Sequence, residues 1–393
     1  MKTLSGIHDI EVNLVKNDTC FFLDFLRQLI QQKSAGMLIF GFVPYLSLYT
    51  VETYKYLQHF FPSYAHSLSI NHHDIIESSR MRIKLFDDSK RQIGGMFELL
   101  KWVNEFQSEW HINRHKGFLA PLKKVLQDDL GIFVYDGHII GSTHTGLFNL
   151  GYHKGDLPTF SKDISAVIGP KTKSVAKELG SYLGQMSRIP EFAPDNCGGK
   201  FAYQIRDEKL GYADAKANKF FRSIFNGTAT EELNSSLFLL LVTVNFFRYI
   251  FKNLLLGSPC TFFKLKYIML YHVASSLEKL YKYYYPKKVL SLDSQERFQA
   301  ILKNEDVHLI LKQSKLRNVF VHYVIKGVSE KDLDPSANLY GLVEYYFKGI
   351  TYKDLNARLN QQIDRISEIL EDWLNWSIPS GKYSTWDFTR DNR

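Results

Sequence analysis

The stretch KDLNARLNQQIDRISEILEDWLNW, residues 353–376, decides the fold that we predict for the C-terminal part of the chain. Its apolar side chains recur every three or four residues, so they form one stripe along a helix, with polar residues elsewhere. The stripe consists of Leu355, Leu359, Ile363, Ile366, Leu370 and Trp373. A helix of this kind buries one face against other helices, so the sequence before it must supply them.

Four further helices are predicted upstream. Thr228 and Glu231 have capping-box spacing and begin a helix that is apolar on nearly every side. Gly257-Ser-Pro259 ends it and begins the next. The four helices are expected over 228–256, from Pro259 to before Pro286, after Asp293, and over 306–325. With 353–376 they predict a five-helix bundle over 228–376, followed by a tail, 377–393.

The first 225 residues have a mixed pattern. Two short apolar runs flank Asp136-Gly137 between Ile132 and Ile140, and Asp-Gly supplies the positive φ angles of a two-residue hairpin. The apolar run Met37–Val43, just before Pro44, predicts a buried strand. Helical patterns cover much of the remainder. The fold class is therefore mixed α/β and mostly α, with a regulatory or substrate-recognition region over 1–225.

The composition is that of a globular protein: 45% of the 393 residues are hydrophobic and 23% are charged. No signal-peptide pattern opens the sequence, and the apolar stretch 237–247 is too short to span a bilayer, so we expect a cytoplasmic protein away from membranes. The net charge is +8. From Arg248 to Arg317, 13 Lys or Arg face 5 Asp or Glu, so this segment is the expected contact for a polyanion such as RNA.

The segment Arg317-Asn318-Val-Phe-Val-His322 carries the chemistry. On a helix, Asn318 and His322 share a polar stripe with Lys315 and Lys326, and we expect the long Arg317 side chain to bring its guanidinium to the imidazole. His moves protons near neutral pH, and Arg donates paired hydrogen bonds to phosphate oxygens. Cleavage of RNA by its own 2′-hydroxyl needs these two functions and no metal or cofactor. Lys312, Lys315 and Lys326 are the predicted RNA-binding residues.

Arg317-Asn318-Val-Phe-Val-His322 resembles the R-x4-6-H signature of the HEPN superfamily (higher eukaryotes and prokaryotes nucleotide-binding), in the form in which a polar residue follows the Arg. The resemblance covers 228–376. It implies an endoribonuclease acting in phage defence, in a toxin–antitoxin pair or in RNA processing, with a possible antitoxin or trigger molecule as partner. It also implies a homodimer in which two such helices form one cleft. Tyr323 and Glu278 are candidate supporting residues.

The sequence leaves two alternative functions open. In the first, the bundle is a non-catalytic dimerisation or RNA-binding module. In the second, the His-rich N-terminal region is a metal-dependent hydrolase, since ten of the thirteen histidines precede residue 155. The metal-ligand candidates are His72, His73, Asp74, His111, His115, His138 and His144. The His111/His115 pair has ligand spacing on a helix, although no HExxH motif accompanies it.

Overall fold

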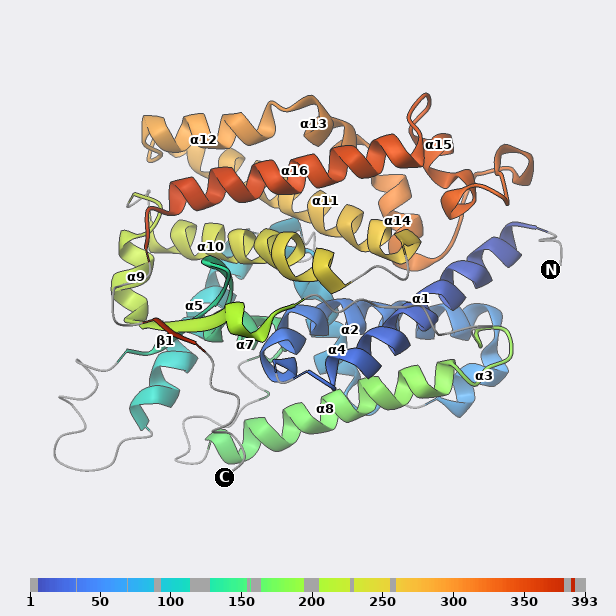
Figure 1. Cartoon of the computed structure of the whole chain (residues 1–393), viewed down its shortest axis with the longest axis horizontal. Helices are drawn as coiled ribbons and strands as arrows, with labels where there is room; N and C mark the ends of the chain where they lie inside the picture. Colours follow the sequence, from blue (N-terminus) through green and yellow to red (C-terminus); the bar gives the residue numbers. More distant parts are fainter. Residues whose placement is uncertain are drawn as a thin grey trace.

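The computed structural model describes residues 6–32, 34–68, 70–87, 93–113, 128–153, 156, 164–193, 205–226, 230–254, 259–377 and 383–385. This described part is mostly helical and contains one small antiparallel sheet (Figure 1). The sequence-based prediction of a mostly α chain with a β-hairpin is therefore confirmed.

The C-terminal helices surround α11, which runs from Pro259 to Tyr284 and contacts α10, α12, α13, α14 and α16. Figure 1 shows α12, α13 and α16 in the upper layer and α10 below α16. The bounds are α10 Glu231–Asn245, α12 Leu292–Leu302, α13 Glu305–Lys312, α14 Ser314–His322, α15 Leu342–Tyr346 and α16 Tyr352–Leu374. The apolar stripe predicted for the last helix is buried along α16. Thr230, rather than Thr228, caps α10, since its side chain accepts a hydrogen bond from the Leu233 N–H.

The predicted helix 306–325 is wrong in its extent, because the chain breaks at Gln313 and again after His322. Gln313 has φ −102° and ψ 53°. Its carbonyl accepts a hydrogen bond from the Tyr267 hydroxyl at 3.1 Å, and its side-chain amide donates to the Tyr346 carbonyl at 2.8 Å. Tyr323 then takes a left-handed conformation, φ 59°. Lys326 therefore does not lie on the helix that carries His322 and Asn318.

The N-terminal helices lie below α10 and α11 in Figure 1, with α8 along the lower edge. Their bounds are α1 Ile7–Leu29, α2 Ala35–Phe60, α3 Pro62–Ser67, α4 His73–Arg82, α5 Ile93–Asn113, α7 Thr143–Asn149, α8 Ile164–Met186 and α9 Ala217–Ser223. Of these, α2 contacts α1, α3, α4, α7, α8 and α14. This helix therefore connects the N-terminal elements to the helix that carries the Arg317–His322 motif.

The strand predicted over Met37–Val43 is wrong, because this run belongs to α2, which continues through Pro44. Proline has no N–H, so the carbonyl four residues earlier loses its helical donor. That carbonyl belongs to Phe40, and the side-chain amide of Asn149 donates to it at 3.1 Å. A side chain from α7 thus replaces the missing backbone hydrogen bond, which local sequence does not indicate.

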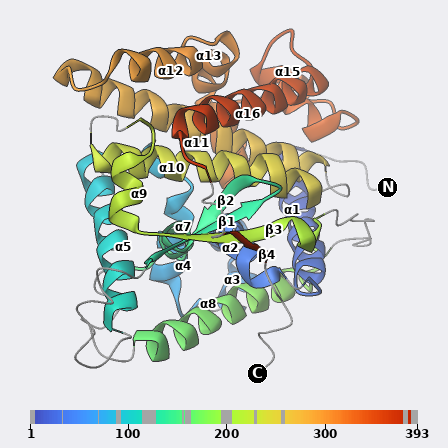
Figure 2. The ribbon, with the colours of Figure 1, turned by 60° about the vertical axis from the view of Figure 1, so that its left-hand side comes forward.

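The sheet has strand order β2-β1-β3-β4, antiparallel throughout, and Figure 2 shows it below α10. Its strands are β1 Leu130–Tyr135, β2 His138–Ser142, β3 Leu210–Ala215 and β4 Tyr383–Thr385. The predicted hairpin is confirmed: Asp136 and Gly137 connect β1 to β2 with φ of 51° and 87°. Sequence reasoning did not predict β3, which pairs with β1 along its whole length.

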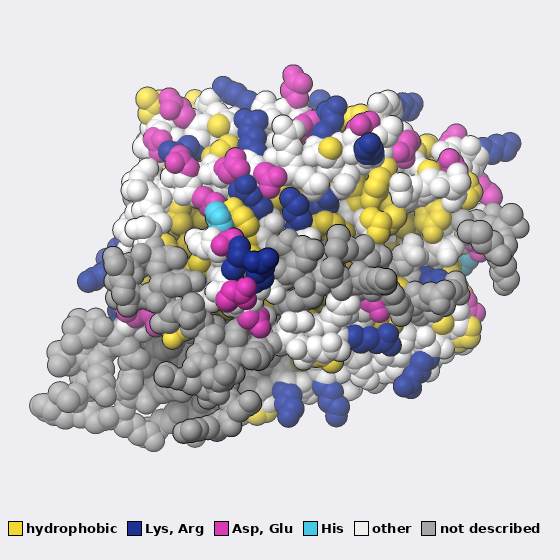
Figure 3. Space-filling model, in the orientation of Figure 1, with side chains coloured by type: hydrophobic (Ala, Val, Ile, Leu, Met, Phe, Trp, Pro, Cys, Tyr) yellow, Lys and Arg dark blue, Asp and Glu magenta, His cyan; other side chains and the backbone are white. Residues whose placement is uncertain are grey.

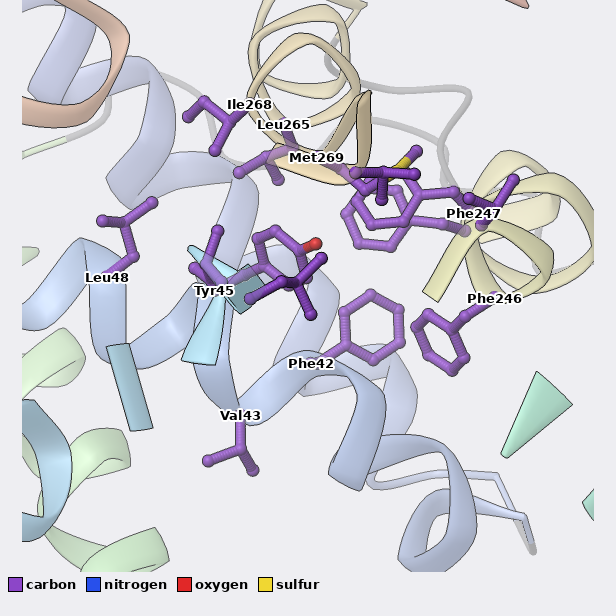
Figure 4. Packing of buried hydrophobic residues seen from close by; sticks show 14 of the residues in the cluster. Phe42, Val43, Tyr45, Leu48, Phe246, Phe247, Leu265, Ile268 and Met269 are labelled. Carbon is purple, nitrogen blue, oxygen red and sulfur yellow. The ribbon is translucent and has the colours of Figure 1, made fainter. Parts of the chain in front are cut away.

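One hydrophobic cluster extends across both halves of the sequence. Figure 4 shows Phe42 and Tyr45 of α2 facing Phe246 and Phe247, which follow α10, with Met269 of α11 nearby. The Phe225 N–H also donates to the Leu374 carbonyl at 2.9 Å. The two regions distinguished by sequence, 1–225 and 228–376, are therefore packed on each other over a shared core.

Among the described residues, two segments are long and apolar enough to cross a membrane, Ala35–Phe60 and Glu231–Ile250, and the second extends beyond the stretch 237–247 that the sequence suggested was too short. Within the protein, 72% and 83% of their most apolar windows are buried. The second segment ends in a π-helical turn, Phe246–Ile250. Both helices contribute side chains to the core shown in Figure 4. A helix buried in the core of a folded protein can be as apolar as one that crosses a membrane.

Candidate functional site

Helix α14 contacts both α2 and α11. Some of its polar residues face solvent, and others face the neighbouring helices. The side chains of Lys312, Lys315, Asn318, His322 and Lys326 are exposed. Arg317 is half-buried, and Tyr323 is buried. An exposed polar face on α14 is thus present as predicted, without Lys326, which follows the end of the helix.

The His322 imidazole is held by a buried carboxylate. Its Nδ1 lies 2.6 Å from Oε2 of Glu52 on α2, and the Glu52 side chain is 3% exposed, compared with 46% for His322. Because a carboxylate only accepts hydrogen bonds, Nδ1 carries the proton. The other carboxylate oxygen, Oε1, pairs with Arg80 of α4. This arrangement fixes the tautomer and orientation of the ring, and Nε2 has no hydrogen-bond partner among the described residues.

The charge of Glu52 follows from its neighbours. Burial alone would raise the pKa of this carboxyl. The hydrogen bond with His322 and the positive charges of Arg80, His322 and Lys55 outweigh burial, so the pKa lies below its usual value. Glu52 is therefore ionised at neutral pH and accepts the hydrogen bond from Nδ1 of His322 as a carboxylate. This is the electrostatic support that a proton-transferring histidine requires.

Arg317 does not join this pair. Its guanidinium carbon lies 4.9 Å from the centre of the Tyr271 ring on α11, a cation–π contact, and no hydrogen bond joins it to His322 among the described residues. Residues five apart on a helix differ by about 140° in direction, which explains the separation. The expected convergence of Arg317 and His322 within one chain is therefore not observed.

Near Arg317 lies a second histidine–carboxylate pair. His272 of α11 is 2% exposed, and its Nδ1 lies 3.0 Å from Oδ2 of Asp87. Lys279 donates to the other oxygen of Asp87 at 2.6 Å. Burial lowers the pKa of His272, Asp87 opposes this, and the charge of Arg317 lowers it further. His272 is enclosed in the core, so we interpret it as a structural residue.

Behind the Glu52–His322 pair, Tyr323 belongs to a buried network. Its hydroxyl donates to Asp18 of α1 at 2.6 Å, and Thr261 donates to the other carboxylate oxygen at 2.9 Å. Lys264 forms an ion pair with the same carboxylate and lies over the Tyr323 ring. Tyr323 thus anchors the end of α14 to α1 and α11. The other candidate supporting residue, Glu278, pairs with Lys282 on α11 at 2.9 Å.

Five of the thirteen basic residues between Arg248 and Arg317 form ion pairs, and four of these five have an acidic partner outside the segment. Figure 3 shows basic and acidic side chains interspersed on one face of the molecule. The pairs are Arg248 with Asp364 and Glu368, Lys264 with Asp18, Lys279 with Asp87, Lys282 with Glu278, and Arg297 with Asp293 and Asp372. The local excess of charge in the sequence therefore overstates the positive potential available to a polyanion.

The candidate metal-binding histidines do not gather. Among the described residues, no three His, Cys, Asp or Glu side chains come together in a way that could hold a metal ion. His72 contacts Ser174 and Glu178, His138 stacks on Tyr249 and pairs with Glu371, and His144 stacks on Phe221. The side chains of His111 and His115 lie outside the described part. The structure thus gives each described histidine a different set of partners.

Sequence reasoning missed Glu52 and Arg80. The signal available was a single acidic residue in the apolar run Tyr45–Thr53, where a carboxylate needs a buried partner. The identity of that partner is not encoded locally, because Glu52 and His322 are 270 positions apart.

Comparison with known proteins does not assign the chain to a family. No family model matches the sequence, and no curated protein or solved structure matches it significantly.

Proposed function

We propose that this protein is a metal-independent endoribonuclease in which His322 transfers the proton during attack by the RNA 2′-hydroxyl. One observation supports this most directly: an exposed imidazole whose Nδ1 is bonded to a buried, ionised carboxylate, Glu52, and whose Nε2 has no partner in the described part of the chain. Histidine–carboxylate pairs of this form serve as general bases. Asn318, one turn before His322 on the same exposed face, is placed to contact a phosphate oxygen.

In the proposed reaction, Nε2 of His322 takes the proton of the 2′-hydroxyl while the oxygen attacks the adjacent phosphorus. The bond to the 5′-oxygen then breaks, and that oxygen must receive a proton from an acid. The products are a 2′,3′-cyclic phosphate and a free 5′-hydroxyl. Arg317 and Lys315 are the proposed sources of the positive charge that stabilises the negatively charged phosphorane. Glu52 keeps the imidazole oriented and stabilises its protonated form.

A second copy of α14 would supply the missing acid. Within one chain, Arg317 contacts Tyr271 and does not reach His322, so one α14 lacks a complete site. Two helices related by a two-fold axis would present two His322 side chains to one phosphate, one as base and one as acid, and Arg317 would have to leave Tyr271 to join them. We therefore propose a homodimer with the exposed face of α14 near the axis. Sedimentation should detect the dimer at micromolar concentration, and Asn318→Arg should weaken it by at least about tenfold, about 1.4 kcal/mol.

Helices α10, α11, α12–α14 and α16 are proposed to form a bundle of HEPN type, consistent with their mutual contacts around α11. On this view the protein acts in the cytoplasm as a toxin or phage-defence effector. An antitoxin or trigger molecule would then act through the N-terminal helices. Glu52 and Arg80 belong to those helices, so a change in α2 or α4 would alter the orientation of His322 directly.

The decisive experiment is digestion of RNA by purified protein with and without EDTA. His322→Ala should reduce the cleavage rate by at least about 100-fold, because loss of a proton-transfer group costs 10²–10⁴-fold. His308→Ala, which removes an exposed histidine on α13, is the matched control and should retain full activity. Equal cleavage by wild type and His322→Ala, or cleavage only with a divalent ion, would contradict the proposal.

The separation of Arg317 from His322 favours one alternative, a non-catalytic RNA-binding or dimerisation module. The same digest distinguishes the two. RNA binding without cleavage, in a wild-type protein that is dimeric, supports the module and contradicts the nuclease.

A further inference from the structure

Helix α2 carries three buried tyrosines, Tyr45, Tyr49 and Tyr56, which differ in what their hydroxyl groups contact. The Tyr49 hydroxyl is bonded to Thr19 at 2.6 Å, and that of Tyr56 lies 3.2 Å from Nδ1 of His8. Tyr45 is 5% exposed, and no described residue forms a hydrogen bond with its hydroxyl. Burial alone raises the pKa of Tyr45, so the hydroxyl is a neutral donor. A buried hydroxyl without an acceptor lowers stability unless another molecule supplies one.

Tyr45 lines a cavity where α2, the β1–β2 hairpin, α7 and the end of α10 come together. Figure 4 shows the Tyr45 ring beside Phe247, and the centres of the two rings lie 5.3 Å apart. Leu239, Val242 and Met269 also contribute to the wall. About 50 Å³ of the cavity can be occupied by the centres of water-sized groups. This is room for about three to five water molecules, or for a ligand of about four to six non-hydrogen atoms.

The wall of this cavity is suited to an uncharged ligand. The lining residues include no Asp or Glu, and Arg82 is the one Lys or Arg among them. The Arg82 guanidinium already donates to the carbonyls of Phe148 and Tyr152, at 3.1 and 3.2 Å. The other polar side chains of the wall each donate a hydrogen bond within the protein, namely Ser142, Thr145, Asn149 and Thr243. Tyr45 is therefore the donor that the described wall leaves for a ligand.

We propose that this cavity binds a small uncharged molecule, mostly hydrocarbon, with one carbonyl oxygen that accepts a hydrogen bond from Tyr45. Burial of the hydrocarbon part against an apolar wall drives binding. The oxygen gives the buried hydroxyl its acceptor, which a pure hydrocarbon cannot do. None of the lining residues belongs to the His322 site, so the proposal does not depend on RNA cleavage.

Cyclopentanone is a ketone of about the right size, and methylenecyclopentane has nearly the same shape without the oxygen. Saturation-transfer NMR with the full-length protein should give a saturable signal for cyclopentanone, with a Kd on the order of 1 mM. Tyr45→Phe should raise that Kd by at least about threefold and leave the binding of methylenecyclopentane undiminished. Tyr54→Phe, on the same helix and outside the cavity, is the matched control and should bind both compounds as wild type does.

Two further measurements do not depend on the affinity of Tyr45→Phe. Thr243→Leu places a larger side chain on the wall and should abolish the cyclopentanone signal. Without ligand, Tyr45→Phe should unfold at the same urea concentration as wild type or a higher one, because it removes an unpaired hydroxyl. Tyr49→Phe loses the bond to Thr19 and should unfold at a lower one.

Three results would overturn the proposal. The first is no saturable cyclopentanone signal in wild type, and the second is the same Kd in wild type and Tyr45→Phe. The third is a loss of stability in Tyr45→Phe as large as that in Tyr49→Phe, since the Tyr45 hydroxyl would then have a partner within the protein.

Discussion

At the scale of single residues, Glu52 contributes both to the stability of the protein and to the proposed chemistry. Its carboxylate is buried between His322 and Arg80. Glu52→Gln keeps the shape and removes the charge, so Arg80 loses its buried partner. We expect the free energy of unfolding at pH 7 to fall by about 3 kcal/mol, the usual cost of breaking a buried ion pair. Denaturant unfolding measures this, and Lys55→Gln, at an exposed neighbour, should change stability by less than about 0.5 kcal/mol.

The pH dependence of that loss follows from the lowered pKa of Glu52. The contribution of Glu52 to stability is fully present above its ordinary pKa of 4.5 and is lost as the pH falls through the lower pKa of the folded protein. The gap in stability between wild type and Glu52→Gln should therefore be widest at neutral pH and close on acidification. A gap that stays constant down to pH 3 would show that Glu52 is not ionised in the folded protein.

At the scale of elements, α2 continues through Pro44 because Asn149 donates to the Phe40 carbonyl at 3.1 Å. Asn149→Ala should cost about 2 kcal/mol, since it leaves that carbonyl without a donor. In Pro44→Ala, the restored N–H can donate to Phe40 as in an ordinary helix. Adding Asn149→Ala to Pro44→Ala should then cost much less than about 2 kcal/mol. Urea unfolding measures these free energies. If the losses from the two substitutions simply add, Asn149 does not replace the hydrogen bond that Pro44 cannot donate.

At the scale of the whole molecule, the shared core predicts one cooperative unfolding unit. Asp18 of α1 and Lys264 of α11 form a buried ion pair between the two halves of the sequence. Asp18→Asn should lower stability by about 3 kcal/mol. The backbone amides of α2 and of α16 should then exchange with solvent faster, both by the factor that corresponds to this loss of free energy. Hydrogen-exchange mass spectrometry measures these rates. Faster exchange confined to α1 and α2 would instead indicate two independent domains.

The sequence alone determined the elements whose signals are local. The stripe of α16 is buried as the three-to-four-residue spacing requires, and Asp136-Gly137 forms a hairpin turn because both positions need positive φ. The tertiary structure decided the rest. The break at Gln313 and the continuity of α2 at Pro44 depend on partners far along the chain. The same holds for the site: sequence identified His322, but only folding brings Glu52 to it, because a buried charge is stabilised by whatever partner the packing supplies.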